Sequence, residues 1–216
     1  MGADRPKQFL DLDGKPVLRR TVECFLDFDP SIELILVLPS DEKAWWRDYC
    51  RQTRFIERFT MVSGGITRFH SVQNALRYVG DDDVVAIHDG VRPLLRRSLL
   101  ERLFAAVEEF PAVIPAVPVV ESVRKAADEE GLVSERVDRT GLMLVQTPQV
   151  FRADTLKAAY RQPFSPSFTD DASVVEASGG RVKIISGDRI NIKITTPEDM
   201  EFASGLIRAF SCGQDS

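Results

Sequence analysis

Short apolar runs alternate along the chain with segments of helical period. The runs at residues 32–38, 84–87 and 113–120 are almost wholly apolar, which is typical of strands covered on both faces. At residues 17–26, directly after Pro16, apolar side chains recur at the spacing of a helix. The other segments predicted as helices are residues 42–51, 71–79, 98–110, 153–160, 170–177 and 197–207. This alternation predicts a layered α/β fold.

One polar segment, residues 122–144, breaks the alternation. Its ends are compatible with strands and its centre, residues 128–131, resembles a turn, so we predict a projecting hairpin arm over residues 120–145. Because an isolated two-stranded ribbon is marginal in water, the arm would gain stability by packing on a second subunit of a homodimer. An ordinary surface excursion explains the spacing equally well.

Composition narrows the class of protein. With 216 residues, 44% of them apolar, the chain is expected to form one domain, residues 1–216, around one core. The net charge of −5 argues against non-specific nucleic-acid binding, which needs phosphate neutralisation by Lys and Arg. Three cysteines without metal-ligand spacing suit a reducing compartment. No apolar stretch is long enough to span a membrane, so we expect a cytoplasmic protein.

A glycine-containing segment, residues 63–71, lies between a predicted strand and the helix that follows. Gly64 and Gly65 allow a ligand to approach the backbone closely, while Arg68 and Ser71 offer hydrogen-bond donors. These features predict an anion site that faces a nucleotide. The alternative is a plain glycine turn in which Ser71 is the N-cap of the helix.

The sequence HDGVRP begins at His88, directly after the strand predicted at residues 84–87. Ligands of open α/β sheets bind beyond the carboxyl ends of strands, so Asp89 is placed to hold Mg²⁺, which would bridge the oxygens of a triphosphate. In the alternative interpretation, Asp89 caps the next turn and pairs with Arg92. We expect His88 to pack or to hydrogen-bond with a neighbouring loop rather than to react.

Further polar residues are candidates for the same site. Lys7 precedes the first helix and could reach phosphate oxygens, although its local sequence alone favours a solvated surface lysine. Arg139 and Lys193 are cations far apart in the sequence, which gives no reason to place them together. Thr169 precedes two acidic residues and could be a helix N-cap instead.

The order of these motifs closely resembles the 2-C-methyl-D-erythritol 4-phosphate cytidylyltransferase family, from Met1 to about Phe210. The matching motifs are PKQ, GGxTR with Ser71, HDxxRP, DRxGL, TPQ, TDDAS and NIKITxPED. The resemblance implies a Rossmann-like, mostly parallel sheet flanked by helices and a hairpin arm used for dimerisation. It also implies transfer of a cytidylyl group from CTP to a sugar-alcohol phosphate, with Mg²⁺ as cofactor.

The resemblance also implies roles for individual residues. The nucleotide site would comprise Gly2, Lys7, Gly64, Gly65, Arg68, Ser71, Asp89 and Lys193. The residues around the acceptor phosphate would be Arg92, Ser122, Arg139, Thr147, Thr169 and Lys193. Lys7, Arg139 and Lys193 would be catalytic, and Asp89 would bind the metal. Any of Arg92, Ser122 and Arg139 could contribute to the active site of the other subunit of the dimer.

The N-terminus departs from the family pattern. Family members normally begin with a β-strand and a glycine-rich loop ending in Arg-Met-Gly, and that Met-Gly falls on Met1 and Gly2 here. We therefore expect an interrupted sheet with unpaired edges and a weaker triphosphate cradle. Our hypothesis is that Met1 is an internal methionine of a longer native chain, which an in-frame stop codon just upstream would contradict. Ser122 and Ile190 also differ from the residues usual in the family, but Ser122 keeps a hydroxyl.

Three other functions stay open at this stage. A cytidylyltransferase for ribitol or another pentitol phosphate shares HDxxRP and TPQ, although DRxGL and the arm around Ser122 favour methylerythritol phosphate. A non-catalytic nucleotide-binding protein would explain the missing glycine loop. A dinucleotide oxidoreductase is disfavoured because no Gly-x-Gly-x-x-Gly follows a strand in this sequence.

Overall fold

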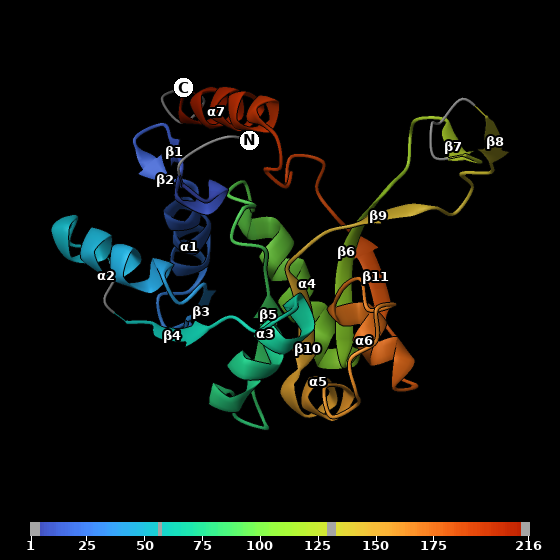
Figure 1. Cartoon of the computed structure of the whole chain (residues 1–216), viewed down its shortest axis with the longest axis horizontal. Coiled ribbons are helices and arrows are strands. Elements are labelled where there is room, and N and C mark those ends of the chain that lie inside the picture. Colours follow the sequence, from blue (N-terminus) through green and yellow to red (C-terminus); the bar gives the residue numbers. More distant parts are fainter. Residues whose placement is uncertain (1–4, 56–57, 129–132, 213–216) are drawn as a thin grey trace.

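The computed structural model describes residues 5–55, 58–128 and 133–212 (Figure 1). Its first half contains the 3₁₀ helix η1 (Lys7–Phe9), β1 (Asp11–Leu12), β2 (Lys15–Pro16), α1 (Val17–Phe28), β3 (Ile35–Leu38), α2 (Glu42–Gln52), β4 (Thr60–Ser63), α3 (Arg68–Ala75), the 3₁₀ helix η2 (Leu76–Tyr78), β5 (Val84–Ile87) and α4 (Arg97–Glu109). Its second half contains β6 (Ala112–Pro118), β7 (Val123–Ala126), β8 (Ser134–Val137), β9 (Met143–Val145), β10 (Gln149–Arg152), α5 (Ala153–Ala159), α6 (Asp171–Ala177), β11 (Lys183–Ser186) and α7 (Pro197–Cys212). Among these described helices, none is both long and apolar enough to cross a membrane.

Five of the described strands form the main sheet. Their spatial order is β11-β6-β10-β5, and β9 is also paired with β6. β11 runs parallel to β6, whereas β10 runs antiparallel to both β6 and β5. The α/β fold expected from the sequence is confirmed. The sheet is mixed rather than mostly parallel, because β10 enters between two strands that share one direction.

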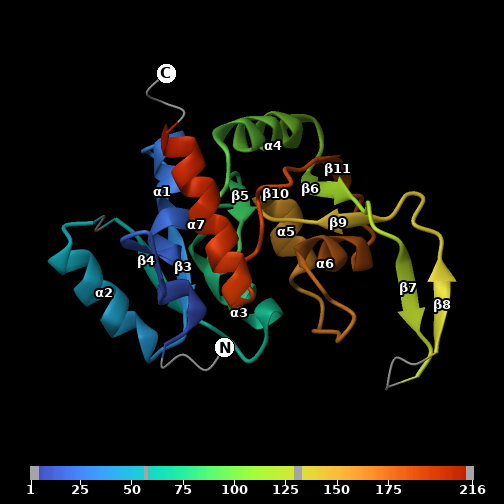
Figure 2. The same cartoon turned by 90° about the horizontal axis from the view of Figure 1, so that it is seen from above.

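Alternate residues of the central strands point to opposite faces of the main sheet. Phe151 of β10 packs on one face, against a core that α3, α5 and α6 cover. Its neighbour Val150 packs on the other face, against residues of α1 and α4. Figure 2 shows α4 on one side of the sheet and α5 and α6 on the other. A strand buried on both faces must be apolar throughout, as β6 is.

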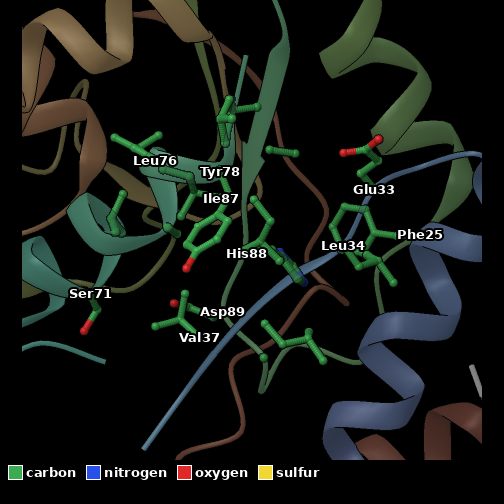
Figure 3. A pocket seen from close by; sticks show the side chains of 18 of the residues that line it. Phe25, Glu33, Leu34, Val37, Ser71, Leu76, Tyr78, Ile87, His88 and Asp89 are labelled. Atoms are coloured by element: carbon green, nitrogen blue, oxygen red, sulfur yellow. The ribbon is translucent and has the colours of Figure 1, made fainter. Parts of the chain in front are cut away.

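A gap separates the main sheet from the parallel pair formed by β3 and β4. A cavity of about 990 Å³ lies there, walled by β3, β5, α1 and α3 (Figure 3). Within the described ranges, β3 pairs only with β4 and β5 only with β10, so neither has a strand partner across the cavity. This is where the sheet is interrupted. The upstream segment suggested by the sequence stays a prediction.

The hairpin arm projects away from the main sheet (Figures 1 and 2). β7 and β8 pair antiparallel, with Val123 opposite Val137, while most of the expected turn falls on residues 129–132, outside the described residues. β9 leads the chain back to β6. Large apolar side chains are exposed along the arm and its connections, namely Val120, Val133, Leu142, Leu144 and Val145. Homodimerisation through this surface stays a prediction.

Candidate active site

The loop between β4 and α3 is fixed by its own helix. Gly65 donates its N–H to Ser71 Oγ at 3.0 Å, and Ser71 Oγ donates to the carbonyl oxygen of Thr67 at 3.0 Å. A Cβ at Gly65 would lie 2.4 Å from Cβ of His70, so only glycine fits this turn. Thr67 caps α3 by accepting the N–H of His70, which means that the interpretation of Ser71 as the N-cap is wrong. Ser71 stabilises the glycine turn instead.

Arg68 begins α3 and lines the cavity beside Gly64, Gly65 and Ser71. Its guanidinium donates to both carboxylate oxygens of Asp171, at 2.9 and 2.5 Å. Burial alone would lower the pKa of Arg68, but the charge and the hydrogen bonds of Asp171 outweigh burial and raise it. The expected nucleotide-facing loop therefore carries a fixed cation.

Asp89 lies two residues beyond the end of β5, where two cations contact its carboxylate. Its Oδ2 is 3.2 Å from Nε of Arg92 and 3.2 Å from Nζ of Lys193. Burial alone would raise the pKa of Asp89, but the charges of Lys193 and Arg92 lower it. The pairing of Asp89 with Arg92 was one of the two interpretations of the sequence. The structure adds Lys193, which local sequence had no means to place there.

A buried hydroxyl connects Asp89 to His88. Thr147 Oγ1 accepts the backbone N–H of Asp89 at 3.0 Å and lies 3.0 Å from Nδ1 of His88. Nε2 of His88 lies 3.1 Å from the carbonyl oxygen of Arg92, so Nε2 donates and Nδ1 accepts from the hydroxyl. Burial lowers the pKa of His88 to about 4, which keeps the ring neutral near pH 7. His88 therefore packs and hydrogen-bonds, as expected.

Asn191, which is fully buried, connects Thr147 to Arg92. Its Nδ2 donates to the backbone carbonyl oxygen of Thr147 at 2.8 Å, and its backbone carbonyl oxygen accepts a hydrogen bond from Nη1 of Arg92 at 2.8 Å. Asn191 was not among the expected site residues, although its place in the NIKITxPED motif was a signal. We refer to the connected residues as the Asp89 network: His88, Asp89, Arg92, Thr147, Asn191 and Lys193.

Gln149 of the TPQ motif is buried and holds the start of α6. Its Oε1 accepts the N–H of Ala172 at 2.9 Å, and its Nε2 donates to Asp170 Oδ2 at 2.7 Å. Asp170 is the N-cap of α6, so the interpretation of Thr169 as the cap is wrong by one residue. Thr169 is exposed directly before the cap. Sequence reasoning missed Gln149, because a motif does not reveal that a polar side chain is buried.

Several expected site residues lie outside the Asp89 network. Lys7 is half-buried on η1, and within the described ranges no hydrogen bond or ion pair joins its side chain to the network. Ser122 and Arg139 are exposed at the arm, where Nη1 of Arg139 donates to the carbonyl oxygen of Val120. Gly2 lies outside the described residues. The expected roles of these four residues stay predictions.

Asp89 is the carboxylate that a divalent cation would meet beside Arg92 and Lys193. No group of three or more His, Cys, Asp or Glu side chains that could hold a metal gathers in the described part of the chain. Mg²⁺ is commonly bound through one or two carboxylates together with substrate phosphates and water. Asp89 therefore fits Mg²⁺ in the company of a triphosphate, and the ion would share the carboxylate with Lys193 and Arg92.

The polar end of the cavity suits the binding of phosphates. In Figure 3, Ser71 and Asp89 line the same hollow as Val37 of β3. Arg68 and Asp89 both line the cavity, and Asp89 holds Arg92 and Lys193 through its carboxylate. Cations and backbone N–H groups fixed before a ligand arrives bind phosphates and stabilise charge that develops on them. The arrangement is therefore suited to a reaction at a phosphate group.

Comparisons with known proteins agree with this chemistry. The family model described as IspD, 2-C-methyl-D-erythritol 4-phosphate cytidylyltransferase, matches residues 1–209. Over 207 residues, the chain is 51% identical to the protein of that name from Bacteroides fragilis and 49% identical to that from Phocaeicola vulgatus, covering 96% of this chain and 93% of each relative. The crystal structure of the protein of that name from Thermus thermophilus matches with a TM-score of 0.78 at 30% identity, over 94% of both chains.

Proposed function

The chain belongs to the 2-C-methyl-D-erythritol 4-phosphate cytidylyltransferase family and is a cytidylyltransferase, and we propose that it acts at the polar end of the cavity. There, CTP would transfer its cytidylyl group to the phosphate of 2-C-methyl-D-erythritol 4-phosphate. The products would be 4-diphosphocytidyl-2-C-methyl-D-erythritol and pyrophosphate. The observation that supports this location is the convergence of Arg92 and Lys193 on Asp89, which lines the cavity together with Arg68.

The reaction must bring two anions together. An oxygen of the acceptor phosphate attacks the α-phosphorus of CTP in line, a new P–O bond forms, and the bond to the β-phosphate breaks. Because the acceptor phosphate is largely ionised near pH 7, no general base has to remove a proton first. Negative charge spreads over the α-phosphate oxygens in the transition state. Positioning and fixed positive charge therefore supply most of the catalysis, and no covalent enzyme intermediate is required.

Lys193 and Arg92 are our candidates for holding the acceptor phosphate. Both contact Oδ2 of Asp89, but the Lys193 side chain is 45% exposed and that of Arg92 only 11%. The ammonium of Lys193 is thus the more accessible cation, and we assign it to the reacting phosphates. The Thr147 hydroxyl already donates to His88 and accepts the N–H of Asp89. It therefore retains one lone pair, which could accept a hydrogen bond from a hydroxyl group of the methylerythritol phosphate. Thr169 would lie at the rim.

On the nucleotide side, Gly65 and Ser71 would face the cytosine, while Arg68 and Lys7 would face the triphosphate. The fixed turn at Gly65 supports this assignment, because a larger residue would displace the loop. Asp89 would hold Mg²⁺ together with phosphate oxygens. When bound, the ion would supply positive charge to the triphosphate and its leaving group.

The arm would supply the remaining acceptor contacts. Ser122 and Arg139 are exposed and belong to no described part of the Asp89 network, so a second copy of the chain is the simplest route by which they reach a site. The exposed apolar residues of the arm support a homodimer, because apolar surface of this kind is buried at symmetric interfaces. We also propose that the enzyme works in the cytoplasm.

The decisive experiment measures pyrophosphate release from CTP with Mg²⁺ and 2-C-methyl-D-erythritol 4-phosphate. Ribitol 5-phosphate in place of the acceptor tests the pentitol alternative, and calorimetry with CTP alone separates binding from catalysis. We expect pyrophosphate only with the methylerythritol acceptor. CTP binding without pyrophosphate release would contradict the proposal and favour a non-catalytic nucleotide-binding protein.

A further inference from the structure

A buried carboxylate stands behind the nucleotide-facing wall of the cavity and has no part in the mechanism above. We propose that Asp171 is a positioning residue which, together with Tyr160, holds the guanidinium of Arg68 in the orientation that binds the phosphates of CTP. This inference rests on the proposed function, since it concerns how the same site receives its nucleotide. It assigns no chemistry to Asp171 itself.

The contact between Asp171 and Arg68 fixes an orientation as well as a charge. Nη1 and Nη2 of Arg68 donate to Oδ1 and Oδ2 of Asp171 at 2.9 and 2.5 Å, across 103 residues of sequence. Two parallel N–H···O bonds hold the planar guanidinium in one plane, which a single contact with a lysine would not do. The rest of the guanidinium therefore points in a direction that Asp171 determines.

The two partners differ in exposure. The side chain of Asp171 is 0% exposed and is not among the residues that line the cavity, whereas that of Arg68 is 41% exposed and lines it. A ligand in the cavity can contact Arg68 but cannot reach Asp171. Asp89, which also lines the cavity, is close enough for its charge to help raise the pKa of Arg68. Asp171 thus acts from the protein side on a cation that faces the site.

Tyr160 restricts the movement of the Asp171 carboxylate. Its hydroxyl donates to Oδ1 of Asp171 at 2.6 Å, and its ring stacks on Phe69 with the centroids 4.7 Å apart. Phe69 follows Arg68 in α3, so the helix that carries the cation packs on the residue that holds its partner. Burial and the charge of Asp171 raise the pKa of Tyr160, which keeps its hydroxyl protonated as a donor.

The backbone of Asp171 is itself held in place. Asp170 caps α6 through a reciprocal pair of bonds with Ser173, and Gln149 binds both Asp170 and the N–H of Ala172. The first turn of α6 is therefore fixed to β10 of the main sheet. Gln149 thus links the strand to the turn that carries Asp171.

A purely structural role is the competing explanation, because the same contacts join α3 to α6. The two explanations differ in what they predict for nucleotide affinity. If the role is purely structural, substituting Asp171 would lower the melting temperature and leave the affinity of the folded protein for CTP unchanged. A positioning residue would affect CTP affinity only while Arg68 is present, so the two substitutions would not be additive.

The test is a double-mutant cycle on Arg68→Ala and Asp171→Asn, with the dissociation constant of CTP measured by calorimetry and kinetics measured by pyrophosphate release. The asparagine keeps the shape but places an amide donor against the guanidinium. We expect Asp171→Asn to weaken CTP binding about tenfold, as for the loss of a charged hydrogen bond, with little change in the KM of the acceptor. The double variant should bind CTP no more weakly than Arg68→Ala alone.

Two further proteins keep the test decisive. Tyr160→Phe removes one hydrogen bond and serves if Asp171→Asn does not fold; it should weaken CTP binding in the same direction by a smaller factor. Glu101→Gln is the matched control, since Glu101 accepts from Arg97 at 3.0 Å on an exposed surface of α4. Unchanged CTP affinity in the folded variants, or additive losses in the cycle, would overturn the inference. Failure of the unsubstituted protein to bind CTP would instead contradict the proposed function.

Discussion

The Asp89 network and the hairpin arm hold their arginines in different ways. Arg92 is 11% exposed and donates both to Asp89 and to the carbonyl oxygen of Asn191, which comes from a distant part of the sequence. Arg139 is exposed, and within the described residues its side chain donates one hydrogen bond, to the carbonyl oxygen of Val120 at the start of the arm. One cation is thus oriented by the folded chain itself. The guanidinium of Arg139 would need contact with another surface, such as a second subunit, to be held in one orientation.

This difference has energetic consequences. Removing one partner of a buried ion pair leaves an uncompensated charge and costs roughly 3–5 kcal/mol, whereas an exposed ion pair contributes at most about 1 kcal/mol. Substitutions in the Asp89 network should therefore affect folding and catalysis together. Substitutions in the arm should affect catalysis alone, and only if the arm reaches a site. The following experiments exploit that separation.

The largest effect is expected from Lys193→Ala, which removes the accessible cation of the Asp89 network. We expect kcat/KM to fall by about 10² or more, as when a single electrostatic stabiliser is removed. Steady-state pyrophosphate release measures the loss. Lys183→Ala is the matched control, because Lys183 lies on β11 and packs over the ring of Phe110. Turnover within a few-fold of the unsubstituted protein would exclude the role of Lys193.

A comparable loss, about 10², is expected from Arg139→Ala if the arm contributes to the acceptor site. In contrast to a substitution in the network, this change should leave the melting temperature unaltered, because Arg139 is exposed. Unfolding followed by circular dichroism and turnover measured on the same preparation show both quantities. Full activity would remove the arm from the mechanism.

Mixing the two inactive proteins determines whether Arg139 acts across a dimer. When Lys193→Ala and Arg139→Ala chains are unfolded and refolded together, half of the dimers should be mixed, and each mixed dimer would contain one site with both native residues. About a quarter of the native activity should therefore return. No recovery, with mixed dimers demonstrated by mass spectrometry, would place Arg139 and Lys193 of the same chain at one site.

The same contrast explains how much the sequence could predict. Apolar period located the helices to within a few residues, including α2, α4 and α5, because their buried faces dictate the pattern. β10 was missed, since four residues that begin with Gln149 do not form an apolar run. Its antiparallel position in the sheet depends on pairing with β5 and β6, which no local pattern encodes.

The site was predictable as a set of residues but not as a geometry. The motifs named Asp89, Arg92 and Lys193, yet only the folded sheet brings Lys193 to Asp89. Asn191 was overlooked because a residue that holds one segment through its side-chain amide and another through its backbone carbonyl oxygen has no signature of its own. Residues held by long-range contacts were the ones whose surroundings the sequence did not reveal.

A smaller effect is expected on the free energy of unfolding at acid pH, because His88 becomes protonated when the chain unfolds. The neutral ring is favoured in the folded protein because burial lowers its pKa to about 4 from 6.5. The unfolded chain therefore binds more protons between these values, and the free energy of unfolding falls as the pH drops through this range. From pH 7 to pH 5 the loss should be about 2 kcal/mol. Urea unfolding at both pH values, compared between the native chain and His88→Asn, measures it; an equal pH dependence in the two would exclude His88 as the cause.

The smallest change probes the hydroxyl that connects His88 to Asp89. Thr147→Val keeps the shape but leaves the N–H of Asp89 and Nδ1 of His88 without their partner, which should cost about 1–2 kcal/mol of stability. Because the loop then holds Asp89 less firmly, we expect kcat/KM to fall about tenfold as well, equivalent to about 1.4 kcal/mol. Thr147→Ser retains the hydroxyl and should keep both properties. The opposite outcome is a valine variant that behaves like Arg139→Ala and loses activity at full stability. In that case, the Asp89 network would not be held together by the folded chain, and the contrast between the network and the arm would fail.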